Sequence, residues 1–172
     1  MEERIKIRFA GAGDIEQIRE LALEIWPPTY DSILSPQQLE YMLNLLYSPA
    51  TLLKQLREQN HVFILASLDN KDIGFASWSA IEQPGVFKVH KLYLLPATQG
   101  KGIGKEMIDF ICTELSGQKG TALRLNVNRH NKARQFYEKN GFKIIGEEDI
   151  DIGNNYFMND YIMEKKLQEG KG

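Results

Sequence analysis

The chain has 172 residues, of which 42% are hydrophobic and 26% are charged, which is enough for one buried core and typical of a single domain. Its 21 Lys and Arg residues against 23 Asp and Glu residues give a formal net charge of -2, which argues against binding to nucleic acid or to an anionic membrane surface. The single cysteine, Cys112, excludes an internal disulfide and a Cys-rich metal site. No stretch reaches the ~20 apolar residues that a membrane span requires. We therefore expect a cytoplasmic protein without a metal.

The N-terminal third is predicted to be one strand followed by helices. Residues 5–9 alternate apolar and charged side chains, as a strand does, and Asp14 resembles the N-terminal cap of a helix that ends at Pro27-Pro28. A second helix is expected to begin after Ser35 and a third, shorter helix after Ser48, because each serine is followed by a proline at the first helical position.

From His61 onward the pattern predicts strands with two further helices. The apolar runs that begin at Val62 and Ile73 flank the turn residues 69–72 and predict a hairpin. The other expected elements are a strand over 86–95, a helix from Ile103 to Leu115, a strand over 122–127, a helix over 132–140 closed by Gly141, and a last hairpin of 142–151 and 156–165. This order predicts a mixed α/β fold around one sheet, in a single domain over 1–167 with a frayed tail over 168–172.

The glycine-rich segment Gln99-Gly-Lys-Gly-Ile-Gly-Lys105 lies between a predicted strand and a predicted helix. Backbone N–H groups and the positive end of the helix can hold a phosphate at such a place, although a lone glycine cluster more often makes only a tight turn. A nucleoside-triphosphate loop requires Ser or Thr after its lysine, where this chain has Glu106. A dinucleotide-binding loop requires a third glycine where this chain has Lys105, so neither class fits.

The same segment resembles the Gln/Arg-x-x-Gly-x-Gly/Ala motif of the GNAT family of N-acetyltransferases, here Gln99 to Gly104 after Leu92-Tyr-Leu-Leu-Pro96. The resemblance implies a GNAT-type, mostly antiparallel twisted sheet with helices on both faces, and acetyl-CoA as the co-substrate. It also implies that the loop amides bind the pyrophosphate of coenzyme A and that the backbone of the preceding strand pairs with the pantetheine arm. The residues expected to contact the coenzyme are Leu92, Tyr93, Leu94, Gln99, Gly100, Lys101, Gly102, Ile103, Gly104 and Lys105.

A second segment, from Leu125 to Phe142, matches another motif of the same family. Ala133 and Tyr137 share one face of a predicted helix with Phe136, an arrangement that by itself is more typical of a core than of catalysis. The resemblance implies that Asn131 binds the coenzyme, that Ala133 leaves space beside it, and that Tyr137 points its hydroxyl at the thioester sulfur. Tyr137 is therefore the candidate acid that protonates the departing thiolate.

A base is also needed, because an alkyl ammonium must lose a proton before its nitrogen can attack the thioester. His90, on the strand before the loop, has a suitable unperturbed pKa of about 6.5, and Glu82 on the same sheet is an equal candidate. A lone strand histidine is more often a packed or surface residue. The backbone N–H of Leu94 is the simplest candidate donor to the oxyanion.

The acceptor side is expected to be aromatic. In the GNAT family the first helices and the late hairpin usually form the acceptor pocket, and Trp26, Tyr30 and Trp78 are the candidates to contact an amine here, although burial in the core is the commoner fate of such side chains. The spread of the chain, including Ser35-Pro36 near the start and Asp160-Tyr-Ile-Met-Glu-Lys-Lys-Leu167 at the end, also resembles the bacterial PaiA-type spermidine/spermine acetyltransferases. A polyamine acceptor follows from that resemblance, and the acidic residues 147–149 and Asp151 would attract a polycation or are simply solvated.

The sequence therefore predicts an enzyme that acetylates a small-molecule primary amine, with a homodimer as a candidate assembly. Two alternatives stay open: a non-catalytic module that binds acyl-CoA, and an acetyltransferase that acts on a protein N-terminus or a lysine side chain.

Overall fold

The computed structural model describes residues 5–167, and the chain divides into two units that are described separately. The first unit consists of the chain up to Ser79 together with Lys91–Phe110. The second consists of Ala80–His90 and the chain from Ile111 onward. Two strands and one helix have residues in both units, because each of them crosses a boundary. The predicted tail over 168–172 lies outside the described residues.

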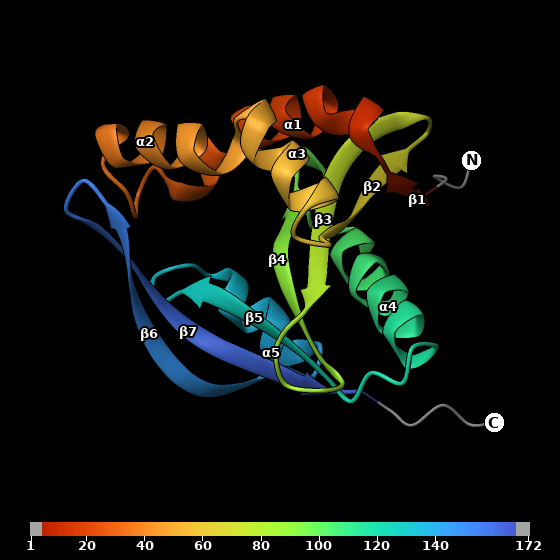
Figure 1. Cartoon of the computed structure of the whole chain (residues 1–172). Helices are drawn as coiled ribbons and strands as arrows, with labels where there is room; N and C mark the ends of the chain where they lie inside the picture. The colour runs from red at the N-terminus through yellow and green to blue at the C-terminus, as the bar shows by residue number, and fades with distance from the viewer. Residues whose placement is uncertain (1–4, 168–172) are drawn as a thin grey trace. The chain divides into compact units, whose positions relative to one another are not determined.

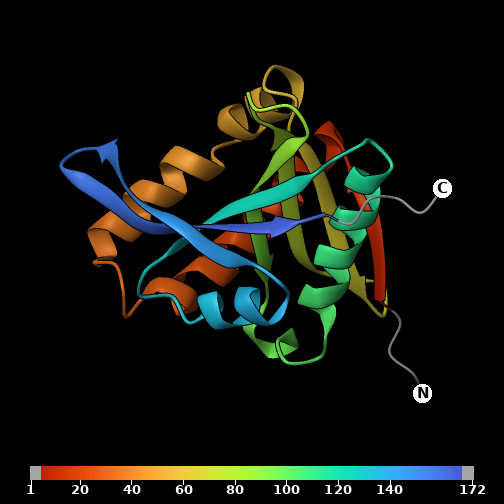
Figure 2. The same cartoon turned by 90° about the horizontal axis from the view of Figure 1, so that it is seen from below.

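The first unit contains a sheet with helices on both of its faces. The elements are β1 (Ile5–Ala10), the short 3-10 helix η1 (Ala12–Asp14), α1 (Ile15–Tyr30), α2 (Pro36–Tyr47), α3 (Pro49–Arg57), β2 (Val62–Leu68), β3 (Lys71–Ala80), the end of β4 (Val86–Leu94), η2 (Pro96–Thr98) and the start of α4 (Ile103–Ser116). The strands follow the order β1-β2-β3-β4. Helices α1 and α3 cover one face and the first part of α4 covers the other (Figures 1 and 2).

The helix starts of α2 and α3 were readable from the sequence. The Ser35 hydroxyl accepts a hydrogen bond from the Gln38 N–H at 3.1 Å, and the Ser48 hydroxyl accepts one from the Thr51 N–H at 3.2 Å. Each bond satisfies a backbone donor that the first helical turn leaves without a partner. The predicted serine caps are confirmed.

Helix α1 begins after Asp14, as predicted, but ends later than predicted. It runs through Pro27 and Pro28 to Tyr30, where the sequence predicted a stop. The Thr29 hydroxyl donates to the Ile25 carbonyl at 2.7 Å, which adds a hydrogen bond to the turn that contains the prolines. Tyr30, at the end of the helix, is buried. Asp14 occupies the N-cap position of α1, but its side chain makes no capping hydrogen bond to that helix; its carboxylate accepts instead from the Gly11 N–H at 2.9 Å.

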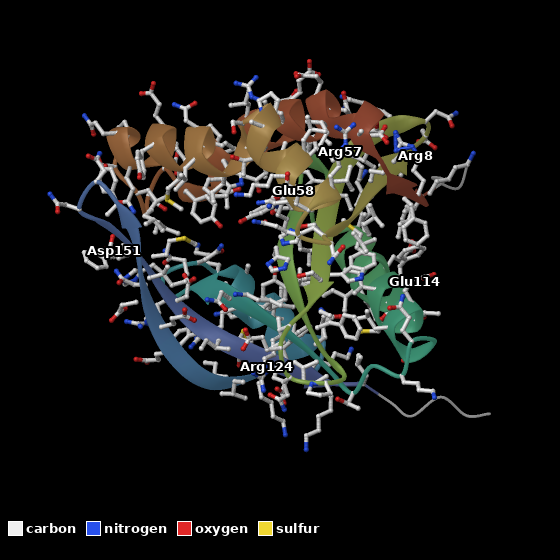
Figure 3. The ribbon with its side chains drawn as sticks, viewed as in Figure 1. Arg8, Arg57, Glu58, Glu114, Arg124 and Asp151 are labelled. Carbon is white, nitrogen blue, oxygen red and sulfur yellow. The ribbon has the colours of Figure 1, made fainter. Side chains whose placement is uncertain are left out.

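The strands β1, β2 and β3 pair in antiparallel fashion, and an ion pair joins β1 to β3. Ile5 pairs with Leu68 and Val62 with Trp78, and the residues Asp69 and Asn70 form the predicted turn with positive φ angles of 50° and 68°. The Arg8 guanidinium, labelled in Figure 3, lies 3.3 Å from the Asp72 carboxylate. The predicted hairpin is confirmed.

The second unit is built on four strands. They are the Val86–His90 part of β4, β5 (Ala122–Asn128), β6 (Lys143–Gly153) and β7 (Tyr156–Lys166), with α5 (Ala133–Lys139) between β5 and β6. The order is β4-β5-β7-β6, in which β4 and β5 are parallel and the other two pairs are antiparallel. On this sheet Arg124, labelled in Figure 3, donates to the Glu164 carboxylate at 2.7 Å from β5 to β7.

The described residues thus form a mixed, mostly antiparallel sheet of seven strands with helices, which confirms the predicted fold class. Within residues 5–167, no helix has the length and apolar character that crossing a membrane requires.

Candidate active site

The glycine-rich loop of the first unit has a backbone conformation that depends on two of its glycines. Gly100 and Gly102 have φ angles of 82° and 79°, in the left-handed region that favours glycine. A Cβ atom at either position would meet nothing within 4 Å, so the space beside the backbone is open. Ile103, which is 1% exposed, anchors the start of α4 directly behind the loop.

Helix α4 directs its N-terminal end at this open loop. Its first helical hydrogen bond runs from the Glu106 N–H to the Gly102 carbonyl at 3.1 Å. The N–H groups of the preceding positions therefore have no acceptor within the helix, and the helix dipole favours negative charge there. The loop and the helix start together fit a pyrophosphate group.

The two loop lysines are both exposed. Lys105 is bound within its own helix, because its ammonium lies 2.8 Å from the Asp109 carboxylate. The hydrogen bond to Asp109 raises the pKa of Lys105. The charge of Lys105 is thus partly offset by Asp109.

The end of β4, just before the loop, is held by an aromatic cluster. The Tyr93 and Tyr30 hydroxyls are hydrogen bonded at 3.0 Å, and the Tyr93 ring lies 5.6 Å from Trp26 and 5.8 Å from Phe75 between centroids. Leu92 and Leu94 are partly buried.

The predicted acceptor residues occupy different faces of the first sheet. Trp26 and Tyr30 lie together, with ring centroids 4.8 Å apart, and are 3% and 8% exposed. Trp78 is 2% exposed. It faces away from Phe75, because the register from Phe75 to Trp78 is regular and strand side chains alternate. The structure therefore brings Trp26 and Tyr30 together, but not Trp78.

A buried lysine lies beside this cluster, and sequence reasoning missed it. Lys91 is 6% exposed, donates to the Gln55 side-chain oxygen at 2.9 Å, and has its ammonium 5.4 Å from the Tyr47 ring centroid and 5.7 Å from that of Phe63. Burial lowers the pKa of Lys91 to about 8. Alternation along β4 carried the signal, because Lys91 shares a face with the buried Val89 and with Tyr93.

The charge of Lys91 also affects a neighbouring histidine. Burial, and then the Lys91 charge, lower the pKa of His61 to about 4. Burial likewise raises the pKa of Tyr47 well above its usual value. Burial beside β4 thus favours the neutral forms of His61, Tyr47 and Lys91.

In the second unit, Asn131 sets the start of α5. Its side-chain oxygen accepts from the Ala133 N–H at 2.9 Å, and its own N–H donates to the Asn128 carbonyl at 2.9 Å. Tyr137 follows one turn later and is 9% exposed, with its ring 5.6 Å from that of Phe142. Ala133, Phe136 and Tyr137 lie on one short helix, as predicted, and Asn131 comes just before it.

The two candidate bases lie in different surroundings. His90 is on β4 and is partly buried. Glu82 is exposed in the connection between β3 and β4, rather than within a strand of the sheet.

Another residue that the sequence did not single out is a buried acid. Asp160 on β7 is 1% exposed, and the Asn126 amide donates to its carboxylate at 3.3 Å. Burial raises the pKa of Asp160. The neighbouring acidic residues of β6 are exposed, and Arg129 lies 2.9 Å from the Asp149 carboxylate and 3.8 Å from that of Glu147. Across residues 5–167 no cluster of three or more His, Cys, Asp or Glu side chains could hold a metal ion.

Comparison with known proteins gives the class to which these features belong. The family model for the acetyltransferase (GNAT) domain matches residues 31–159. Spermidine N(1)-acetyltransferase of Thermoplasma acidophilum is 35% identical over 170 residues, which cover 95% of this chain and 98% of that protein. The crystal structure of the PaiA N-acetyltransferase of the same organism in complex with coenzyme A superposes with a TM-score of 0.80 at 33% identity, over 95% of this chain and 99% of the other.

A more distant structure shares the fold alone. The ribosomal-protein-S18-alanine N-acetyltransferase of Escherichia coli matches with a TM-score of 0.72 at 16% identity, over 96% of this chain and 95% of the other.

The family-model match over residues 31–159 shows that this chain belongs to the GNAT family of acetyltransferases. It is an acetyl-CoA-dependent N-acetyltransferase, as the sequence predicted.

Proposed function

We propose that the acceptor of this acetyltransferase is a polyamine of the spermidine class. The observation that carries the proposal is the similarity to a spermidine N(1)-acetyltransferase along nearly the full length of both chains. Exposed carboxylates on β6 give further support, because Glu147, Glu148, Asp149 and Asp151 form a negative surface that would attract a polycation. Arg129 neutralises only part of it.

The coenzyme contacts are proposed residue by residue. The backbone from Gly100 to Lys105, with Gln99 before it, would hold the pyrophosphate, and the open space beside Gly100 and Gly102 supports this role. The backbone of Leu92–Leu94 would pair with the pantetheine arm. In the second unit, Asn131 would bind the coenzyme and Ala133 would leave space for it.

The proposed reaction is direct attack of the amine on the thioester. The nitrogen forms a bond to the carbonyl carbon, the carbon–sulfur bond breaks, and the thiolate takes a proton from Tyr137, while the proton lost by the nitrogen passes to Tyr137 and restores its hydroxyl. Free Tyr has a pKa of about 10 and a thiol one of about 8.5, so unassisted transfer is uphill by roughly 2 kcal/mol. A concerted return of the amine proton removes that cost.

Deprotonation of the acceptor is the larger barrier. An alkyl ammonium of pKa about 10.4 is neutral about once in 2,500 molecules at pH 7, which corresponds to roughly 4.6 kcal/mol. We propose His90 or Glu82 as the base, acting directly or through water. The variants His90→Gln and Glu82→Gln separate the two: loss of the true base reduces kcat and removes the corresponding limb of the pH–rate profile.

The acceptor side is proposed to be formed around Tyr30. Its hydroxyl, paired with that of Tyr93, offers a polar group at the edge of an aromatic cluster that can stabilise a cation. Trp26 packs directly against the Tyr30 ring and would hold it in place. Trp78 is not part of this proposal, because it is buried on the opposite face of the sheet.

We further propose that one acetyltransferase domain extends over residues 1–167, because the family match over 31–159 includes parts of both units. The single cysteine supports a cytoplasmic location.

The test is an acceptor panel at saturating acetyl-CoA, with thiol release followed for spermidine, spermine, putrescine, amino acids, an aminoglycoside and a peptide with a free N-terminus. We expect the highest kcat/KM for spermidine or spermine. A clear preference for the peptide would replace this proposal by protein acetylation. The control is Tyr137→Phe, which should lower kcat by about 100-fold and leave the affinity for coenzyme A unchanged.

A further inference from the structure

A close contact joins β3 to the end of β4 in the first unit. A Cβ atom built on Gly74 would lie 2.6 Å from the Tyr93 carbonyl oxygen and 2.5 Å from the Leu94 Cδ2 atom, and 3.4 Å from the Leu94 Cα atom. Real Cβ atoms essentially never come closer than 3.0 Å to such neighbours. Only glycine permits β4 to lie where it does.

The strand is irregular at the same place. Between β2 and β3, Ala66 pairs with Gly74 but Ser67 pairs with Asp72, so Ile73 is an extra residue in β3. The Ile73 carbonyl accepts a hydrogen bond from the Leu95 N–H at 2.9 Å. Bulges of this kind redirect a strand and are common beside functional sites. The bulge thus fixes the chain directly after Leu94, while Gly74 fixes its distance from β3.

The surroundings decide which strand would yield if Gly74 carried a side chain. Its neighbours on β3 are held in the core, since Ile73 is 3% exposed and Phe75 is fully buried. The Tyr93 side chain is itself held by the Tyr30 hydroxyl and the Trp26 ring. The strain would therefore fall on the backbone between Tyr93 and Leu94.

We propose that Gly74 is a positioning residue for acetyl transfer, which sets the backbone of Tyr93 and Leu94 against the thioester. This inference rests on the proposed function, in which the Leu92–Leu94 backbone pairs with the pantetheine arm and the Leu94 N–H donates to the oxyanion. A displacement of about 1 Å at such a donor can cost roughly 100-fold in rate. The pyrophosphate loop is not part of this contact.

Two variants test the proposal, Gly74→Ala and Leu94→Ala. The first adds the clashing Cβ atom, and the second removes the side chain that packs on Gly74 and so loosens the strand end without adding an atom. The matched control is Gly146→Ala, a strand glycine whose Cβ atom would lie 3.8 Å from Ile162 Cδ1, an ordinary contact. Leu94→Ala decides the matter by itself if Gly74→Ala fails to fold.

The measurements are kcat, thermal unfolding, and the affinities for coenzyme A and for 3′-phospho-ADP, which carries the pyrophosphate but no pantetheine. We expect Gly74→Ala to lower kcat by about 10- to 100-fold and Leu94→Ala by a smaller factor, with coenzyme A bound more weakly and 3′-phospho-ADP bound as before. Gly146→Ala should match the unmodified protein throughout.

Unchanged kcat in either folded variant would overturn the proposal, as would parallel losses of affinity for both ligands. The comparison of the two ligands needs no acceptor amine. It therefore still tests the position of Gly74 if no amine in the panel is acetylated and the polyamine proposal fails.

Discussion

The buried ammonium of Lys91 makes a specific prediction about stability. Burial lowers the pKa of Lys91 from the usual 10.5 to about 8, which corresponds to about 3 kcal/mol against the charged form in the folded chain. Lys91→Met keeps the volume and removes the charge, but it would also leave the Gln55 side-chain oxygen without the Lys91 donor, which costs about 1–2 kcal/mol. The substitution should therefore raise the free energy of unfolding by about 1–2 kcal/mol at pH 7.

The pH dependence of the free energy of unfolding tests independently whether the Lys91 charge is unfavourable in the folded chain. Between pH 8 and 10.5 the unfolded chain still holds the Lys91 proton, whereas the folded chain has released it. The free energy of unfolding of the unmodified protein therefore rises with pH through that interval, by at most about 1.4 kcal/mol per pH unit from this group. Lys91→Met lacks this rise, so its advantage at pH 7 shrinks as the pH increases.

Urea unfolding at several pH values from 7 to 10 measures both effects. The control is Lys54→Met, which removes an exposed lysine from the same helix that carries Gln55 and should leave the pH profile unchanged. If Lys91→Met is less stable than the unmodified protein at pH 7 and shows the same slope with pH, the ammonium is not an unfavourable buried charge and the reasoning is refuted.

Two further predictions follow from neighbouring contacts. An NMR titration should place the pKa of His61 at about 4, so that stability falls as the pH decreases from 6.5 toward 4, where only the unfolded chain gains the proton. Lys91→Met should raise that pKa, and an unchanged value would exclude the interaction. Asn131→Ala removes the bond to the Ala133 N–H and should cost about 1 kcal/mol in urea unfolding, whereas Asn131→Asp keeps an acceptor and should cost less. Equal losses for the two substitutions would contradict this role.

Local patterns in the sequence predicted the elements whose cause is also local. The serine caps of α2 and α3, the turn at Asp69 and Asn70, and the last hairpin each depend on residues within a few positions of one another. The glycine-rich loop between β4 and α4 was predictable for the same reason, because its glycines, its preceding strand and its following helix are contiguous.

Features that depend on distant partners were not predictable in this way. Helix α1 passes its two prolines and ends at Tyr30, whose ring packs against Trp26 and whose hydroxyl meets that of Tyr93, 63 residues later in the chain. Lysine and aspartate side chains usually lie at the surface, and only the tertiary structure shows that Lys91 and Asp160 are buried. The contact at Gly74 depends on how closely two strands approach, which no single-strand pattern encodes.

The most direct test of the central claim is the stoichiometry of one reaction. The protein is incubated with acetyl-CoA and spermidine, and mass spectrometry of the amine is compared with the amount of free thiol produced. Acetyl transfer to the amine predicts one monoacetylated spermidine for each thiol released, with little thiol released when the amine is omitted. Thiol release without an acetylated amine, or no release with any amine of the panel, would contradict it.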